Sequence, residues 1–222
     1  MSSYAPPCNA NSFYVFFCRR LVVFSVKPCE IAQCRNPALT GPQTGDALLC
    51  MQHVANPEQS LEKICIMLES TTEVLDLCFQ GAAISDLVLR NRQFTECSFS
   101  RGAFTNVDFS ASRFRLCFFD FCTFDSCAFK KTDIKYSVFA GSRFTNCDFS
   151  SSDILHCNYN GIHATSSSFT ESDLYFSSFS GSELRQTSFV DCNLKKVRFN
   201  GSRRADVSFK YSNYEAADFG ED

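Results

Sequence analysis

The chain has 222 residues, of which 45% are hydrophobic, so it is long enough to bury a substantial core. Its 21 basic residues are set against 24 acidic ones, which gives a net charge of −3. This near balance excludes a strong electrostatic field for nucleic acid or for highly basic partners, and direct nucleic-acid binding is not expected.

The first 45 residues hold five of the six prolines and show no regular period. Two short apolar runs, at 13–18 and 21–26, are separated by Arg19 and Arg20, and no basic segment precedes them. This arrangement predicts neither a secretory signal peptide nor a membrane span. Two interpretations of residues 1–40 remain. They are either part of a cap on the region that follows, or a determinant of targeting or secretion.

A helix is predicted near 57–69. Asn56 is a favourable N-cap, Pro57 suits the first helical position, and Gln59 occupies the third. Four apolar residues would then share one face, namely Leu61, Ile64, Cys65 and Leu68. We expect this helix to cap the repeat region, since terminal repeats need covering. The predicted division is an N-terminal region at 1–70 and a repeat region at 71–222.

From Phe79 to Phe219 an apolar residue, here called the centre, occupies every fifth position at 28 of 29 sites, Arg204 being the exception. Neither an α-helix nor an ordinary strand repeats every five residues. A fixed internal period predicts units that stack to share one core. Arg204 should turn outward, because burying an unpaired charge is costly.

Two further regularities define the predicted coil. The position two residues before each centre is mostly small, as at Cys97, Gly102, Val107, Ser112, Cys117 and Cys122. Glycine follows the centre by two residues at sites separated by multiples of twenty, namely Gly81, Gly141, Gly161, Gly181 and Gly201. Glycine at such sites is typical of type II turns. We therefore expect a corner every five residues and about seven coils of about twenty residues.

The aromatic centres predict how the coils stack. Of the 15 centres whose numbers end in nine, 13 are Phe. Coils of twenty residues would place Phe99, Phe119 and Phe139 directly over one another.

Units such as CDFSS (147–151), SDLYF (172–176), CNLKK (192–196) and ADFGE (217–221) resemble the pentapeptide-repeat family. The resemblance covers about two thirds of the chain. It implies an all-β fold, a right-handed four-sided parallel β-helix. It says little of function, because members of that family do many different things.

Fourteen cysteines would suggest a disulfide scaffold in a short secreted protein. Seven of them occupy the small inward position, namely Cys97, Cys117, Cys122, Cys127, Cys147, Cys157 and Cys192. If Cys97 stacks over Cys117 one coil away, the distance between their Cα atoms would fall within the range that a disulfide can span. Since Ser, Thr and Val also occupy this position, we expect buried free thiols and a cytoplasmic, reducing location.

No catalytic or metal-binding pattern emerges from the repeats. His156 and His163 fall on outward positions with different orientations, so they should not share a metal. The Asp residues that precede many centres suit hydrogen bonding in turns. We find no phosphate-binding loop, nucleophile elbow or zinc spacing. The sequence therefore predicts a protein that is not an enzyme, with no cofactor and no metal.

One set of outward residues departs from the small and polar pattern found elsewhere. With twenty residues per coil it forms a stripe along one outer edge, comprising Arg115, Leu116, Phe118, Lys135, Tyr136, Leu155, His156, Tyr175, Phe176 and Lys195. Aromatic residues flanked by basic ones are typical of a protein-binding surface. Two alternatives are cross-strand stacking that stabilises the wall, and coverage by the N-terminal segment.

The C-terminal coil leaves Phe209, Tyr214 and Phe219 near an uncovered sheet edge, where a second copy could pair. Members of the family it resembles often pair end to end, so a homodimer is a candidate.

We therefore expect a non-catalytic scaffold that binds a protein partner through the stripe. One alternative is a DNA-mimicking protector of type II topoisomerases, which some pentapeptide-repeat proteins are. That role needs a strongly acidic surface, whereas the repeat region has 16 basic residues against 19 acidic ones. The other alternative is a secreted bacterial effector with an N-terminal signal.

Overall fold

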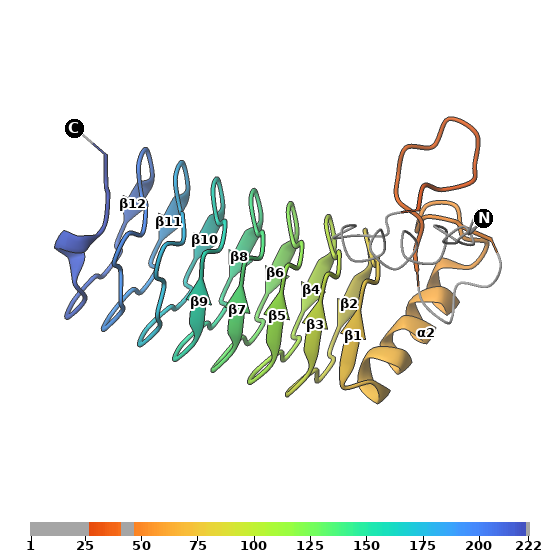
Figure 1. The fold of residues 1–222 in the computed structure, drawn as a ribbon, viewed down its shortest axis with the longest axis horizontal. Helices are drawn as coiled ribbons and strands as arrows, with labels where there is room; N and C mark the ends of the chain where they lie inside the picture. The colour runs from red at the N-terminus through yellow and green to blue at the C-terminus, as the bar shows by residue number, and fades with distance from the viewer. Residues whose placement is uncertain (1–26, 41–46, 221–222) are drawn as a thin grey trace, which may run out of the picture.

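The structure is a computed structural model that describes residues 27–40 and 47–220. Figure 1 shows a column of coils that runs from β1 to β12, with helix α2 lying across its N-terminal end. The helices are α2 (Pro57–Ser70) and a final 3₁₀ turn, η1 (Tyr214–Ala216). The strands are β1 (Glu73–Leu75), β2 (Ala83–Ser85), β3 (Gln93–Thr95), β4 (Ala103–Thr105), β5 (Arg113–Arg115), β6 (Thr123–Asp125), β7 (Asp133–Lys135), β8 (Arg143–Thr145), β9 (Asp153–Leu155), β10 (His163–Thr165), β11 (Glu183–Arg185) and β12 (Arg203–Ala205).

The coils have four walls, and each wall pairs in parallel with a register of twenty residues. One wall is the sheet β1-β3-β5-β7-β9, and a second is β2-β4-β6-β8-β10-β11-β12. In them Val74 pairs with Phe94, and Ile84 with Phe104. The other two walls are joined by single bridges, such as Cys78 to Ser98 and Val88 to Asp108. The predicted fold, a parallel β-helix of about seven coils with a short N-terminal helix, is confirmed.

The corners lie where the five-residue period places them. Every fifth residue from Asp76 to Tyr211 has a positive φ, between 49° and 77°. Glycine occupies only some of these sites, so it was an incomplete marker of the corner. At the others, a backbone hydrogen bond to the next coil helps to hold the left-handed conformation, as from the N–H of Asn106 to the Asp125 carbonyl at 2.9 Å.

The centres form columns of stacked rings inside the coil. Ring centroids are 4.9 Å apart between Phe99 and Phe119 and 4.8 Å apart between Phe119 and Phe139. The predicted stack is therefore confirmed. Such parallel, closely spaced rings combine apolar burial with favourable aromatic contact.

The small inward side chains are hydrogen-bond donors to the coil above. The Ser142 hydroxyl donates to the Phe119 carbonyl at 2.6 Å, and the Cys122 thiol donates to the Phe99 carbonyl at 3.1 Å. This shared role explains why Ser and Cys alternate at one position. Burial raises the pKa of Cys122 to about 12, which keeps its thiol protonated and able to donate. The described cysteines are all free thiols.

Helix α2 begins as its sequence predicts and packs on the first coil. The Asn56 side chain accepts a hydrogen bond from the N–H of Gln59 at 3.0 Å. Ile64, Met67 and Leu68 are buried in the core that continues into the coils, while Leu61 and Cys65 are only partly buried. Arg92 stands at a normally small position because its guanidinium donates to the Glu69 carbonyl at the C-terminal end of α2, at 2.6 Å.

The opposite end of the column is more open. All three residues of β12 are exposed. Arg204 is exposed as expected, and its guanidinium lies 4.6 Å from the ring centroid of Phe219. A cation over an aromatic face at this distance is a favourable contact.

Candidate functional site

Four residues of the predicted stripe form one continuous corner of the column, here called the aromatic corner: Leu116, Tyr136, His156 and Phe176. They follow one another at one-coil intervals, because β5, β7 and β9 pair in register and Asp153 bridges to Asp173. The exposed fractions are 36% for Leu116, 56% for Tyr136 and 48% for Phe176. The aromatic corner is thus an exposed apolar surface.

The rings of the aromatic corner contact one another along the column. The centroids of Tyr136 and His156 are 5.3 Å apart with the ring planes 21° from parallel. Those of His156 and Phe176 are 5.0 Å apart, and Tyr175 contacts His156 edge-on and Phe176 at a tilt of 51°. The stacking predicted as an alternative is therefore present, and Tyr136 and Phe176 remain exposed to solvent along their outward edges.

The backbone at the aromatic corner is left-handed at each residue, with φ of 54°, 55°, 56° and 60° from Leu116 to Phe176. This conformation costs a side-chain-bearing residue about 1–2 kcal/mol, least for Asn and Asp. The diagonally opposite corner has the same geometry and carries Asp86, Asn106, Ser126, Asn146, Ser166, Gln186 and Asp206. The fold therefore does not require aromatic residues at a corner.

The other two corners carry isolated apolar residues. Phe121 follows Arg101, whose guanidinium lies 5.4 Å from its ring centroid, and precedes Gly141. Ala111 and Tyr211 likewise have polar or charged corner residues one coil away. Among the described corners, a run of four apolar or aromatic residues occurs once.

The basic residues beside the aromatic corner are arranged differently from the prediction. Arg115 and Lys135 are half-buried and both form ion pairs with Asp133, the latter at 3.1 Å. Burial raises the pKa of Asp133, but hydrogen bonds and charge from Arg115 and Lys135 outweigh it, and the pKa is lowered. These two cations therefore stabilise the wall and are not free flanking charges.

The basic end of the aromatic corner lies one coil further on. Lys195 and Lys196 are exposed, and the Lys196 ammonium lies 5.5 Å from the ring centroid of Phe176 and 5.9 Å from that of Tyr175. The opposite end of the same corner column carries Glu96. Sequence reasoning placed Lys195 in the stripe and missed Lys196, although its twenty-residue spacing from Phe176 is the signal that finds it.

The remaining stripe residues, Phe118, Leu155 and Tyr175, are half-buried on the adjoining walls. Residues 27–40 lie at the first coil, where Thr40 and Cys78 exchange hydrogen bonds. Residues 1–26, which also belong to the segment predicted as an alternative cover, lie outside the described residues. His156 and His163 do not meet, since His156 stacks on Tyr136 while His163 lies 3.2 Å from Glu183.

A group of residues that sequence reasoning did not consider gathers at the N-terminal end. Cys29, Cys34, Cys50 and His53 place their sulfur and nitrogen atoms within 4.8 Å of one another. The signal was present as a Cys-x4-Cys pair and a Cys-x2-His pair. Each pair supplies only two ligands, so neither predicts a zinc site until the fold brings the two pairs together.

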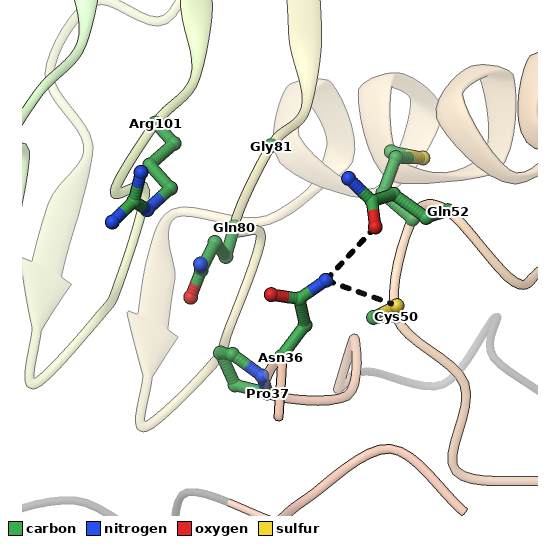
Figure 2. A pocket seen from close by; sticks show the side chains of 8 residues that line it. Asn36, Pro37, Cys50, Gln52, Gln80, Gly81 and Arg101 are labelled. Carbon is green, nitrogen blue, oxygen red and sulfur yellow. Dashed lines mark hydrogen bonds between the residues drawn. The ribbon is translucent and has the colours of Figure 1, made fainter. Parts of the chain in front are cut away.

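A cavity of about 270 Å³ lies where this N-terminal segment meets the first coils (Figure 2). Asn36, Cys50 and Gln52 line one side. Gln80, Gly81 and Arg101 line the other. The Asn36 amide bridges its own side of the cavity by donating to Gln52 at 3.0 Å and to the Cys50 sulfur at 3.8 Å.

Within the described residues, no helix has the length and apolar character needed to cross a membrane.

Comparison with known proteins agrees with the architecture. The sequence model described as "Pentapeptide repeat region" matches residues 142–221. Residues 142–221 therefore belong to a pentapeptide repeat region. No curated protein matches it.

Several solved structures are similar to it, and those of HetL and Rfr23 are described as pentapeptide repeat proteins. Full-length QnrB1, a plasmid-mediated fluoroquinolone resistance protein, is 16% identical with a TM-score of 0.30, over 65% of this chain and 86% of that one. HetL, involved in heterocyst differentiation regulation in the cyanobacterium Nostoc, is 11% identical with a TM-score of 0.31, over 66% and 84%. Rfr23 from the cyanobacterium Cyanothece is 9% identical with a TM-score of 0.26, over 72% and 99%. Likenesses of this size carry no argument about function.

Proposed function

We propose that this pentapeptide-repeat protein is a non-catalytic binding module whose aromatic corner docks a protein partner. The observation that carries the proposal is the run of Leu116, Tyr136, His156 and Phe176 at left-handed, exposed corner sites. Polar residues fill the equivalent sites on the diagonally opposite corner. These residues add backbone strain and expose apolar side chains to solvent, and the fold does not require them. A role in binding at the surface is the best explanation for them.

The shape and chemistry of the aromatic corner fit an extended protein surface. Four coils at the inter-strand spacing of about 4.8 Å give an apolar ridge about 15 Å long. Rigid aromatic side chains on a rigid scaffold lose little entropy on binding and make strong anchors. None of the ion pairs among the described residues involves Lys195 or Lys196. An apolar segment followed by acidic residues would therefore match the ridge and its basic end.

The charge arrangement does not favour the DNA-mimic alternative. Several outward carboxylates are already paired with cations on neighbouring coils, as Asp108 is with Arg90 at 2.5 Å and Asp148 with Lys130 at 2.9 Å. Glu183 pairs with Arg203 at 2.9 Å. A surface that resembles DNA needs unpaired negative charge.

Two further features of this proposal concern assembly and location. The C-terminal rings of Tyr214 and Phe219 stack at 4.1 Å, and Tyr214 is 45% exposed, which supports end-to-end pairing of two copies. Sedimentation at several protein concentrations would measure this pairing. The buried free thiols of the coils support a reducing, cytoplasmic location.

The test of the binding surface uses two double variants matched in geometry. Tyr136→Ser with Phe176→Ser alters the aromatic corner. Asn146→Ser with Gln186→Ser alters the opposite corner at the same spacing and with the same left-handed backbone. Each purified protein is immobilised, partners are captured from cell extract, and their affinity is then measured with the isolated partner.

We expect the aromatic-corner variant to bind its partner more than about tenfold more weakly, because aromatic anchors dominate interface energy. The opposite-corner variant should bind as the unaltered protein does. Equal binding by both variants, or failure of the unaltered protein to retain any partner, would contradict the proposal. Unfolding of the aromatic-corner variant would instead assign these residues a structural role.

A further inference from the structure

The four N-terminal residues Cys29, Cys34, Cys50 and His53 have the separations of tetrahedral ligands. The sulfur atoms of Cys34 and Cys50 are 3.9 Å apart. The Nδ1 atom of His53 is 3.3 Å from the Cys29 sulfur and 3.4 Å from the Cys50 sulfur. Around a tetrahedral zinc ion, bond lengths of about 2.3 Å to sulfur and 2.0–2.1 Å to nitrogen give ligand separations of about 3.8 and 3.6 Å.

The backbone brings these side chains together from two segments. An antiparallel bridge between Pro28 and Pro37 closes a hairpin, and the N–H of Cys34 donates to the Ile31 carbonyl at 3.0 Å inside its turn. The N–H of Glu30 donates to the Leu48 carbonyl at 2.8 Å, which fixes the second segment beside the hairpin. The turn that carries Cys50 and His53 is closed by a backbone bond between them at 2.9 Å.

The surroundings of the sulfur atoms suit thiolates. Cys29 and Cys50 are buried and Cys34 is half-buried. The Asn36 side-chain amide donates to the Cys50 sulfur at 3.8 Å (Figure 2). Donors of this kind orient and stabilise metal-bound sulfur.

We propose that Cys29, Cys34, Cys50 and His53 form a structural zinc site that fastens the N-terminal segment to the β-helix. Three thiolates and one imidazole are the ligand set that zinc favours, and the Cys-x4-Cys spacing suits it. Four ligands from the chain fill the tetrahedron and leave no open position for a substrate, as in structural sites. On binding, the thiols that are still protonated release their protons to solvent, and no group is oxidised or reduced.

The N-terminal segment needs such a fastening because it has almost no core of its own. Apart from the cysteines, the buried residues of 27–40 and 47–53 are Ala38 and Leu39. Segments this short rarely stay folded without a metal or a disulfide. The contact of Thr40 with Cys78 and the burial of Leu39 in the main core join the site to the first coil. A bound zinc would thus hold a cap on the open end of the repeats.

The cysteines of the coils differ from these four residues, because hydrogen bonding within the β-helix accounts for their positions. Cys117 donates to the Phe94 carbonyl and Cys157 to the Ile134 carbonyl, each at 3.4 Å. Each of these thiols donates to a backbone carbonyl of the neighbouring coil, and where two of them stack, as Cys97 and Cys117 do, no histidine joins them. The N-terminal cysteines converge on one point together with a histidine.

The experiment measures metal in the full-length protein, purified without a metal-affinity tag, by elemental analysis. Cys34→Ser removes one half-buried ligand. Cys65→Ser changes another half-buried cysteine, in α2, and serves as the matched control. We expect about one zinc ion per chain in the unaltered protein and in the control, and less than about 0.2 in Cys34→Ser. Replacement with Co²⁺ should give the visible absorption of a tetrahedral thiolate site in the first two proteins only.

A third measurement separates loss of metal from loss of fold. Chelation should make residues 27–40 and 47–53 more sensitive to protease while the repeats keep their circular dichroism, because the column has its own core. The proposal is overturned by an unaltered protein without zinc and without a cobalt spectrum, by equal zinc in Cys34→Ser, or by iron in place of zinc. Peptide mapping that finds a disulfide among the three cysteines would also overturn it.

Discussion

The aromatic corner and the diagonally opposite corner are built on one backbone and differ only in their side chains. Both are left-handed at every coil, and in both the corner N–H donates to a carbonyl of the next coil. The opposite corner joins coils through polar contacts, such as Asn106 to Asp86 at 3.0 Å and Ser166 to Gln186 at 3.1 Å. The aromatic corner joins them by ring stacking and leaves carbon exposed.

The comparison separates what the fold needs from what the surface adds. Asn and Asp, which recur at the opposite corner, adopt the left-handed backbone with less strain, so stability does not explain four successive bulky residues at the aromatic corner. Side chains inside the coil are, in contrast, determined by the fold, because each is held by close packing. Substitutions inside the coil should therefore be costly, and substitutions at either corner should be mild.

The largest effect is expected inside the coil. Phe139 is fully buried between Phe119 and Tyr159, with ring centroids 4.8 and 4.7 Å away. Phe139→Ala should lower the free energy of unfolding by about 3–5 kcal/mol through lost burial and a cavity. Chemical denaturation followed by circular dichroism measures this. A loss below about 1 kcal/mol would mean that the column is not closely packed.

A smaller effect is expected at the inward hydroxyl groups. Ser142 donates to the Phe119 carbonyl at 2.6 Å and accepts from the Cys122 N–H at 2.9 Å. Ser142→Ala leaves both buried groups without this partner and should cost about 2–3 kcal/mol. Ser142→Cys, which restores a donor of the kind found at Cys122, should cost less. The reverse order in denaturation midpoints would show that size, not hydrogen bonding, decides this position.

The aromatic corner itself should tolerate polar replacement. Tyr136→Asn removes a ring contact with His156 but introduces a residue that accepts the left-handed backbone more readily. We expect the free energy of unfolding to change by less than about 1 kcal/mol. A thermal melt beside Asn146→Ser, a polar replacement at the corresponding site of the opposite corner, provides the measurement. A large loss at Tyr136 alone would make the ring stack structural.

The smallest effect concerns pH. The pKa of Asp133 is lowered in the folded protein by Arg115 and Lys135, so its contribution to stability is complete above the ordinary value of 3.8. That contribution is lost as the pH falls through the lowered pKa, because the carboxylate is then protonated. Asp133→Asn should therefore be less stable than the unaltered protein at pH 6, and the difference should shrink below pH 3.8. A difference that is independent of pH would mean that the ion pairs contribute nothing.

The fold was predictable because one physical constraint recurs in every coil. A closed coil must place a large centre and a small neighbour inward at each wall, so the five-residue period alone fixes the walls, the corners and the stacks of Phe99, Phe119 and Phe139. Outward positions are not under that constraint and are mostly small or polar. The apolar and aromatic residues Leu116, Tyr136, His156 and Phe176 could therefore be recognised as exceptions to that pattern.

Features that depend on contacts outside the period could not be predicted in this way. The pairing of Arg115 and Lys135 with Asp133 depends on side-chain conformations across two coils. Cys29, Cys34, Cys50 and His53 come together because of a hairpin. This hairpin lies outside the repeats, so the five-residue period does not predict it. The two short motifs were readable, but their convergence is a matter of tertiary structure.

The central claim, that the aromatic corner is a protein-binding surface, is tested most directly by photo-crosslinking inside cells. A photoreactive phenylalanine derivative is placed at Tyr136 in one variant and at Asn146 in the other, at equivalent exposed corner sites. We expect a discrete crosslinked protein partner from position 136 and none from position 146. Crosslinks that are absent at both positions, or identical from both, would contradict the claim.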